Sequence, residues 1–156
     1  TSRNPDRRAR LAELGFDKVL DDHRGRIADE VLALTEGRGA DVILDMVGGP
    51  ALEDNFRAAA LGARVVSIGR LAGGRCAIDL DQLALRRLKL FGVTFRSRSI
   101  EEHATVVSRF VADLMGEIEA GRLVPVVDRV VPFAEADHAL ARMRANEHLG
   151  KIVLTL

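Results

Sequence analysis

The sequence predicts an α/β fold built on a parallel sheet. Three apolar segments show no polar alternation, as expected of strands that are buried on both faces. Segments with helical periodicity lie between them, which is the pattern of successive β-α units. Two of the predicted strands also begin with similar sequences, which are Gly39-Ala40-Asp41-Val42-Ile43 and Gly62-Ala63-Arg64-Val65-Val66. The chain has 156 residues, 47% of them apolar, which is enough for one globular domain with a core.

The first helix has the clearest boundaries. Asn4, Pro5 and Asp6 supply a capping side chain, a proline at the first helical position and an acid in the first turn, and Gly15 ends the helix. Apolar stripes predict further helices over 27–37, 50–60, 80–88, 100–120 and 135–144. Strands are expected over 18–20, 40–47, 64–69, 90–95, 126–133 and 150–156. The last strand carries no polar tail, so it should pair with a neighbour that the sequence does not identify.

Composition excludes several classes of function. Lys and Arg together number 23, and Asp and Glu also number 23, so the chain lacks the basic excess that a nucleic-acid partner requires. No apolar run approaches the length of a membrane span, which predicts no membrane partner. Five of the first ten residues are charged, which predicts no signal peptide in this chain. A single cysteine, Cys76, excludes an internal disulfide and a multi-cysteine zinc site, and we expect a cytoplasmic protein.

Motifs for direct catalysis are missing from the sequence. It contains no G-x-x-x-x-G-K-[ST], no H-E-x-x-H and no G-x-S-x-G, and its four histidines show no ligand spacing. The sequence therefore offers no catalytic or metal-binding motif of these classes.

Glycine-rich segments follow two successive predicted strands, at 47–49 and at 69–74. In an open parallel sheet, ligands bind beyond the carboxyl ends of the strands, where small residues let them approach the backbone. The alternative is that these glycines only turn the chain into the next helix. Ser2 and Arg3 precede the first helix, where a hydroxyl and a guanidinium suit an anion. The alternative there is a capping serine and a solvated arginine.

Four segments in register resemble the zeta-crystallin-like quinone oxidoreductases of the medium-chain dehydrogenase/reductase superfamily. They are GADVILDMVGG (39–49), GARVVSIGRLAG (62–73), LFGVTFRSRSIEEH (90–103) and HLGKIVLTL (148–156). The similarity runs from end to end of the chain. It implies a Rossmann-like sheet and an NADPH-dependent oxidoreductase that transfers hydride to a quinone or another α,β-unsaturated carbonyl.

The resemblance also implies an incomplete domain. In the family, a catalytic domain, two Rossmann strands and a G-x-G-x-x-G turn precede the segments seen here, and this chain has no such motif. We expect 1–99 to be a partial NADP-binding Rossmann domain whose 40–47 strand is left as an exposed apolar edge. Residues 100–156 would pack on the absent catalytic domain, where strands 126–133 and 150–156 would pair. The resemblance places the catalytic groups in the missing domain, and the quinone reductases do without zinc, so it implies no catalytic residue and no metal ligand in this chain. The isolated chain should then be inactive and marginally stable.

Cofactor residues are carried over from the family position by position. Ser2 and Arg3 match the end of the family's second Rossmann strand, where NAD-dependent enzymes place an acid. A guanidinium at this place suits a 2′-phosphate, so the cofactor is expected to be NADP. Val47 and Gly48 match the loop over the adenosine ribose, Gly69 and Arg70 the loop beside the nicotinamide ribose, and Phe95 and Arg96 the stretch that meets the carboxamide. Asn146 matches a loop residue whose side chain reaches the cofactor.

The segment from Lys89 to Phe95 is expected to be the edge strand of the sheet. It is apolar, and in the family this edge pairs with its twin, so we predict a homodimer. Two alternatives to the reductase stay open. One is a non-catalytic dimerisation or binding module derived from such a reductase. The other is a methyltransferase-like domain that binds S-adenosylmethionine, because ADVILDMVGG also resembles the acidic strand end of that class.

Overall fold

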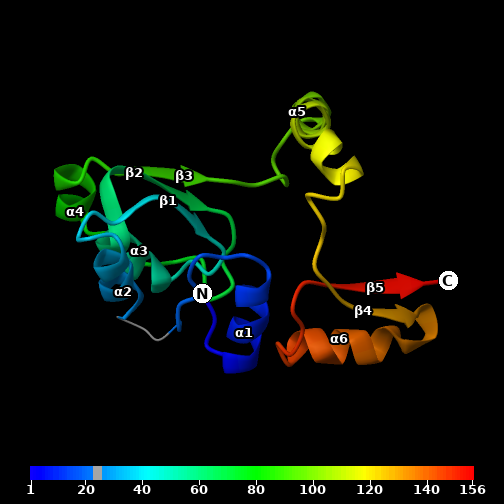
Figure 1. The fold of residues 1–156 in the computed structure, drawn as a ribbon. Coiled ribbons are helices and arrows are strands. Elements are labelled where there is room, and N and C mark those ends of the chain that lie inside the picture. Colours follow the sequence, from blue (N-terminus) through cyan, green and yellow to red (C-terminus); the bar gives the residue numbers. More distant parts are fainter. Residues whose placement is uncertain (23–25) are drawn as a thin grey trace. The chain divides into compact units, whose positions relative to one another are not determined.

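A computed structural model describes residues 1–22 and 26–156 (Figure 1). The chain divides into two compact units, Thr1–Ser97 and Arg98–Leu156, which are described separately. Among the described residues, no helix is both long and apolar enough to cross a bilayer.

The first unit is a three-stranded parallel sheet with helices in its connections. Its strand order is β1-β2-β3, so the predicted parallel α/β fold is confirmed (Figure 1). The elements are α1 (Pro5–Glu13), α2 (Ile27–Leu34), β1 (Ala40–Asp45), α3 (Ala51–Ala58), β2 (Ala59–Ser67), α4 (Leu80–Leu85) and β3 (Lys89–Gly92).

The start of α1 follows the predicted capping pattern. The Asn4 side chain accepts a hydrogen bond from the Arg7 N–H at 2.9 Å, and Pro5 is the first helical residue. The predicted strand at 18–20 is wrong, because this segment has only isolated pairing. Ser2 N–H donates to the Leu20 carbonyl and Asp22 N–H to the Ser2 carbonyl, which is too short a ladder for a strand.

β2 begins at Ala59, directly after α3 and five residues before the predicted start. The Arg86 guanidinium makes this abrupt junction possible, since its Nη1 donates to the carbonyls of Arg57 and Ala59 at 3.0 and 2.7 Å. The helix end is thus capped by a side chain far along the sequence, which local patterns do not reveal. At the other edge, β3 stops at Gly92 rather than Phe95, because its partner β2 ends at Ser67.

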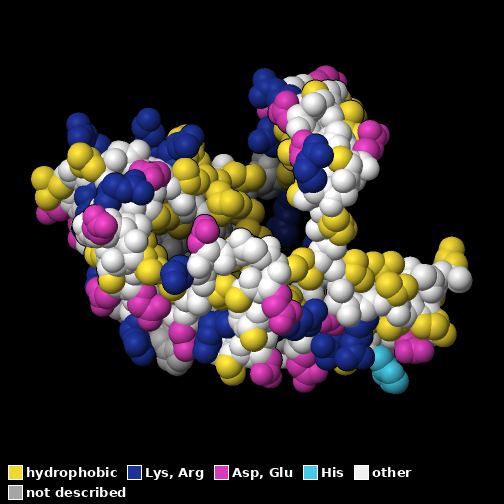
Figure 2. Space-filling view, in the orientation of Figure 1, with side chains coloured by type: hydrophobic (Ala, Val, Ile, Leu, Met, Phe, Trp, Pro, Cys, Tyr) yellow, Lys and Arg dark blue, Asp and Glu magenta, His cyan; other side chains and the backbone are white. Residues whose placement is uncertain are grey.

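The core of the first unit lies between the sheet and its helices. Val65 is fully buried at the centre of β2, and Phe56 from α3 and Leu88 pack in the same cluster. Both outer strands expose apolar residues: Leu44 of β1 is 65% exposed and Phe91 of β3 is 46% exposed. Apolar side chains accordingly gather on the surface near β2 and β3 (Figure 2). The predicted apolar edge at β1 is therefore present.

The second unit contains α5 (Ile100–Glu119), β4 (Val127–Pro132), a 3₁₀ turn (Phe133–Glu135), α6 (Ala136–Arg144) and β5 (Lys151–Thr155). β4 and β5 pair in parallel with each other, connected through α6. Each strand thus has one neighbour within the chain, a pairing that the sequence did not indicate, and the expected pairing on a catalytic domain stays a prediction. A parallel neighbour requires a crossover, and α6 provides it within the chain. Apolar side chains also line β4 and β5 (Figure 2).

Candidate functional site

The loops after β1 and β2 interlock at the carboxyl ends of these strands. The backbone carbonyl of Asp45 accepts the N–H groups of Ile68 and Gly69 at 2.8 and 3.0 Å, and Ala72 N–H donates to the Val47 carbonyl at 2.8 Å. This is the edge of a parallel sheet at which ligands bind. The sequence predicted both loops, and the structure brings them together.

Three glycines make this loop contact possible. A Cβ on Gly69 would collide with the carbonyl oxygen of Met46, so only glycine fits. Gly48 has a φ of +65°, and a Cβ there would lie 3.1 Å from both the Arg70 Cα and the Gly69 carbonyl oxygen. Gly49 has a φ of +55° and faces the Ala72 carbonyl in the same way, at 2.9 Å. The glycines therefore serve loop packing as well as any ligand.

A cavity of about 380 Å³ opens beside the first loop. Arg3 and Val47 are the predicted site residues in its wall. The wall consists of Arg3, Asp22, Ile27, Val47, Pro50, Ala51, Glu53, Asp54, Asn55, Arg57 and Ala72. It thus joins the entry to α1, the start of α2, the loop after β1 and the exposed side of α3.

Charges of both signs line this cavity. The Arg3 guanidinium is largely exposed and its Nε lies 3.9 Å from Asp22 Oδ2. Arg57 is held by Asp29 at 2.8 Å and Asp54 at 3.2 Å. Arg3 is the cation that an incoming anion would reach first, in competition with Asp22. Sequence reasoning missed the role of Arg57, since no local motif marks it.

Ser2 has a different environment from Arg3. It is buried, and its hydroxyl accepts a hydrogen bond from Asn4 N–H at 3.3 Å. Its carbonyl accepts from Arg8 Nη1 at 2.8 Å. These contacts fix the chain entering α1 and thereby place Arg3 at the cavity.

The other predicted residues lie outside the wall of this cavity. Gly69 and Arg70 belong to the interlocked second loop, and Arg70 is exposed. Phe95 and Arg96 follow the end of β3 and are exposed; the Arg96 N–H donates to Thr94 Oγ1 at 3.2 Å.

Asn146 belongs to the second unit, where it ends α6 in a left-handed conformation with φ of +54°. Its N–H donates to the Met143 carbonyl at 3.0 Å, and the Glu147 N–H donates to the Arg142 carbonyl at 3.2 Å. This pair of bonds is a Schellman motif, in which asparagine is a favoured residue. The cap accounts for asparagine at this position.

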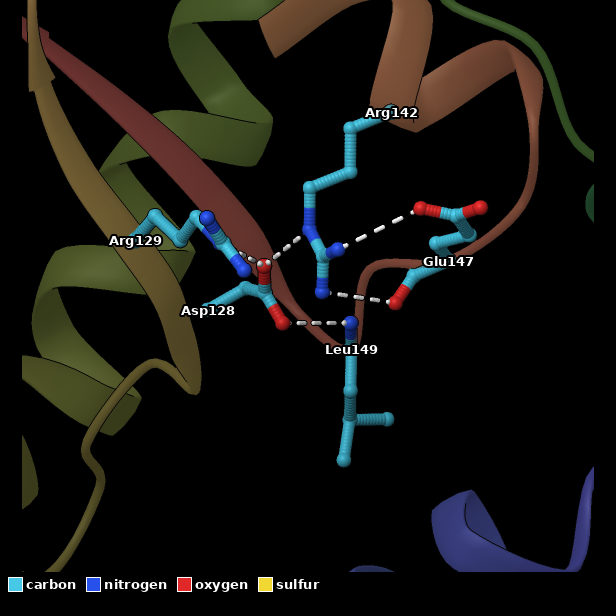
Figure 3. A network of polar contacts seen from close by, with 5 residues as sticks. All are labelled: Asp128, Arg129, Arg142, Glu147 and Leu149. Atoms are coloured by element: carbon cyan, nitrogen blue, oxygen red, sulfur yellow. Dashed lines mark hydrogen bonds and ion pairs between the residues drawn. The ribbon is translucent and has the colours of Figure 1, made fainter.

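The loop that carries Asn146 is fixed by a buried carboxylate (Figure 3). The Asp128 side chain is 2% exposed; one oxygen lies 3.0 Å from Arg142 Nε, and the other accepts the Leu149 N–H at 3.1 Å. Arg142 in turn donates to the Glu147 carbonyl at 2.9 Å. The hydrogen bond that Arg142 donates to the Asp128 carboxylate raises the pKa of Arg142, so this cation stays charged.

No metal centre is assembled in residues 1–22 and 26–156. These residues contain no group of three or more His, Cys, Asp and Glu side chains that could hold a metal ion. The described part of the chain thus supplies no donor set for zinc.

The parallel sheet with interlocked loops at its carboxyl edge defines an α/β domain of the ligand-binding, doubly wound class. A family model described as zinc-binding dehydrogenase matches residues 14–154. The chain therefore belongs to the zinc-binding dehydrogenase family of the medium-chain dehydrogenase/reductase superfamily, which confirms the resemblance seen in the sequence.

Individual relatives agree with this assignment. Quinone oxidoreductase-like protein 2 of Bos taurus is 25% identical over 152 residues, which are 97% of this chain and 43% of the relative. A solved NAD-dependent alcohol dehydrogenase superposes with a TM-score of 0.76 at 27% identity, over 98% of this chain and 42% of that protein. The apo JamJ enoyl reductase gives a TM-score of 0.77 at 25% identity, over 99% and 46%. The chain thus spans less than half the length of these relatives.

Proposed function

We propose that this chain is the part of an NADPH-dependent oxidoreductase that holds the adenosine end of the cofactor. The enzyme transfers hydride from NADPH to a quinone or another α,β-unsaturated carbonyl. The observation that carries the proposal is the 380 Å³ cavity at the carboxyl edge of the sheet, with the Arg3 guanidinium in its wall. The names of the quinone oxidoreductase-like and enoyl reductase relatives support the reaction class.

The residues present fit the adenosine end of NADP. Arg3 is a largely exposed cation suited to a 2′-phosphate, and Val47, Pro50 and Ala51 offer apolar contacts for the nucleoside beside the charged residues of the wall. Gly48 lets the neighbouring backbone approach closely. When bound, the nicotinamide cofactor supplies the hydride; this chain's residues bind and orient it. Gly69, Arg70, Phe95, Arg96 and Asn146 are proposed as further contacts along the cofactor.

Nucleotide fragments test the assignment directly. In amide NMR spectra of the 156-residue chain, we expect 2′,5′-ADP to shift the signals of Val47, Gly48 and Ala72 with an affinity in the millimolar range or better. 5′-AMP lacks the 2′-phosphate and should bind more weakly. The variant Arg3→Ala should remove the difference between the two ligands, whereas Arg38→Ala, which deletes a cation paired with Asp41 outside the cavity wall, should preserve it. Equal shifts by both ligands in the wild type would refute the NADP preference.

The exposed β3 edge supports a second proposal, that two chains pair through it as a homodimer. Leu90 and Phe91 are 39% and 46% exposed on this strand, which pairs with β2 alone among the residues that the structure describes. Sedimentation of the wild type and of Phe91→Lys tests this, because a charge on the edge should give monomers. If the wild type is monomeric at all concentrations, the dimer is refuted. Dimerisation without any nucleotide binding would favour the non-catalytic binding module instead.

A cytoplasmic location is proposed for the same protein. Its one cysteine, Cys76, is free and exposed, which suits a reducing compartment.

A further inference from the structure

We propose that Asp45 is the positioning residue of the candidate nucleotide site. It fastens the loop after β1 to the loop after β2 and so holds Val47 and Ala72 in the cavity wall. This inference rests on the proposed function, because it concerns how that cavity keeps its shape.

Asp45 accepts four backbone N–H groups, two through its main chain and two through its side chain. Its carbonyl oxygen receives those of Ile68 and Gly69, which open the second loop. Its Oδ1 receives those of Val47 and Gly48, both at 2.9 Å, which form the first loop. One residue at the end of β1 therefore anchors both loops.

The carboxylate is buried, since Asp45 is only 5% exposed. Its second oxygen, Oδ2, has no hydrogen-bond partner among the described residues, and no ion pair of Asp45 is found there. An unpaired buried oxygen is unfavourable for folding. The residue type is therefore better explained by what Oδ1 holds than by stability of the strand.

A short chain of contacts leads from Asp45 to the cavity. The N–H of Val47 is fixed on Oδ1, and the carbonyl of the same Val47 accepts the Ala72 N–H at 2.8 Å. Val47 and Ala72 both line the cavity, whereas Asp45 does not. Removal of the carboxylate would free the Val47 and Gly48 amides and let both wall residues move, without taking away any group that touches the ligand.

Two substitutions separate the effect of the hydrogen bonds from that of the charge. Asp45→Ala removes the acceptor, whereas Asp45→Asn retains an oxygen that can accept both N–H groups. Leu88→Ala serves as the matched control, because Leu88 belongs to the core immediately before β3 and does not line the cavity. Each variant is titrated with 2′,5′-ADP by NMR at a temperature at which it is folded, and amide exchange of Val47 and Gly48 is measured without ligand.

Asp45→Ala should raise the dissociation constant for 2′,5′-ADP by about 10-fold or more, the equivalent of losing one charge-assisted hydrogen bond. It should also speed exchange of the two amides. Asp45→Asn should recover most of both losses, and Leu88→Ala should change neither although it lowers stability. An unchanged dissociation constant in Asp45→Ala would overturn the proposal, as would an equal loss in Leu88→Ala.

Failure of the proposed function would look different. If the wild type shows no shift with 2′,5′-ADP, the nucleotide assignment is overturned and the cavity role of Asp45 with it. Amide exchange still decides the loop contact, since unchanged exchange in Asp45→Ala would show that the carboxylate does not hold the loops.

Discussion

Asp45 in the first unit and Asp128 in the second are both buried carboxylates that fix a loop by accepting backbone N–H groups. They differ in how their charge is balanced. Asp128 has the guanidinium of Arg142 at 3.0 Å and that of Arg129 at 3.6 Å, and both its oxygens have partners (Figure 3). The Asp45 carboxylate accepts hydrogen bonds from backbone N–H groups and has no guanidinium partner among the described residues. One of its two oxygens has no hydrogen-bond partner there.

This difference separates a stabilising acid from an acid that serves a site. A buried charge is tolerated when it is paired and hydrogen-bonded, as at Asp128. A buried carboxylate with one oxygen lacking a hydrogen-bond partner, as at Asp45, is found where a local geometry serves function rather than stability. The comparison predicts that changes around Asp128 act on folding, and that changes around Asp45 act on the loops and their ligand.

The largest expected effect is that of Asp128→Ala. It leaves the Arg142 guanidinium without its buried partner and frees the Leu149 N–H, so we expect the second unit to lose about 3–5 kcal/mol of stability. Urea unfolding, monitored by the amide exchange of β5, measures the stability of the second unit separately from that of the first. The control is Glu117→Ala, which breaks a pair with Arg122 and should cost little stability because that pair is exposed to solvent. Equal effects of the two variants would contradict the comparison.

Gly69→Ala should be next in size. Its new Cβ would strike the Met46 carbonyl and push the two loops apart, at a cost of about 1–3 kcal/mol in the first unit and with weaker binding of 2′,5′-ADP. Gly74→Ala lies in the same segment and meets nothing nearer than the Arg70 Cδ at 3.9 Å, so it should be near neutral. Urea unfolding and the NMR titration check both variants, and a neutral Gly69→Ala would show that the loops can separate freely.

Asn146 gives a smaller effect, again on folding. Asn146→Ala places an unfavourable residue in the left-handed cap of α6 and should cost about 1–2 kcal/mol. Asn146→Gly keeps the cap and should be close to wild type in the same unfolding measurement. If both variants lose equal stability, the Asn146 side chain rather than its backbone conformation matters to the fold.

The smallest effect concerns pH at the start of α5. The hydrogen bond from the Ser99 hydroxyl lowers the pKa of Glu101 from its usual value of 4.5, and the Glu102 carboxylate accepts the Ser99 N–H in the same capping arrangement. A lowered pKa in the folded state contributes stability above pH 4.5 that is lost as pH falls through the lowered value. The protection factors of the amides in the first turn of α5, which correct for the intrinsic pH dependence of exchange, should therefore fall below pH 4.5. Ser99→Ala should weaken this dependence, and a pH-independent turn would refute it.

Much of the fold was predictable because its causes are local. Asn4 and Pro5 set the start of α1, and the largely apolar segments at 40–47 and 64–69 identified two strands of the parallel sheet. The predicted strand at 18–20 failed because three residues carry too weak a pattern to show whether a ladder forms. The pairing of β4 with β5 was missed because a parallel partner is chosen by the crossover rather than by the strand.

The sequence by itself determined the parallel α/β class, the glycine-rich loops and the family to which the chain belongs, since these depend on residue order along short segments. Only the tertiary structure decided which groups meet: Arg86 on the end of α3, Gly69 against Met46, and the four N–H groups on Asp45. These contacts join positions up to 29 residues apart. Their geometry follows from strand register and helix packing, which no local pattern specifies.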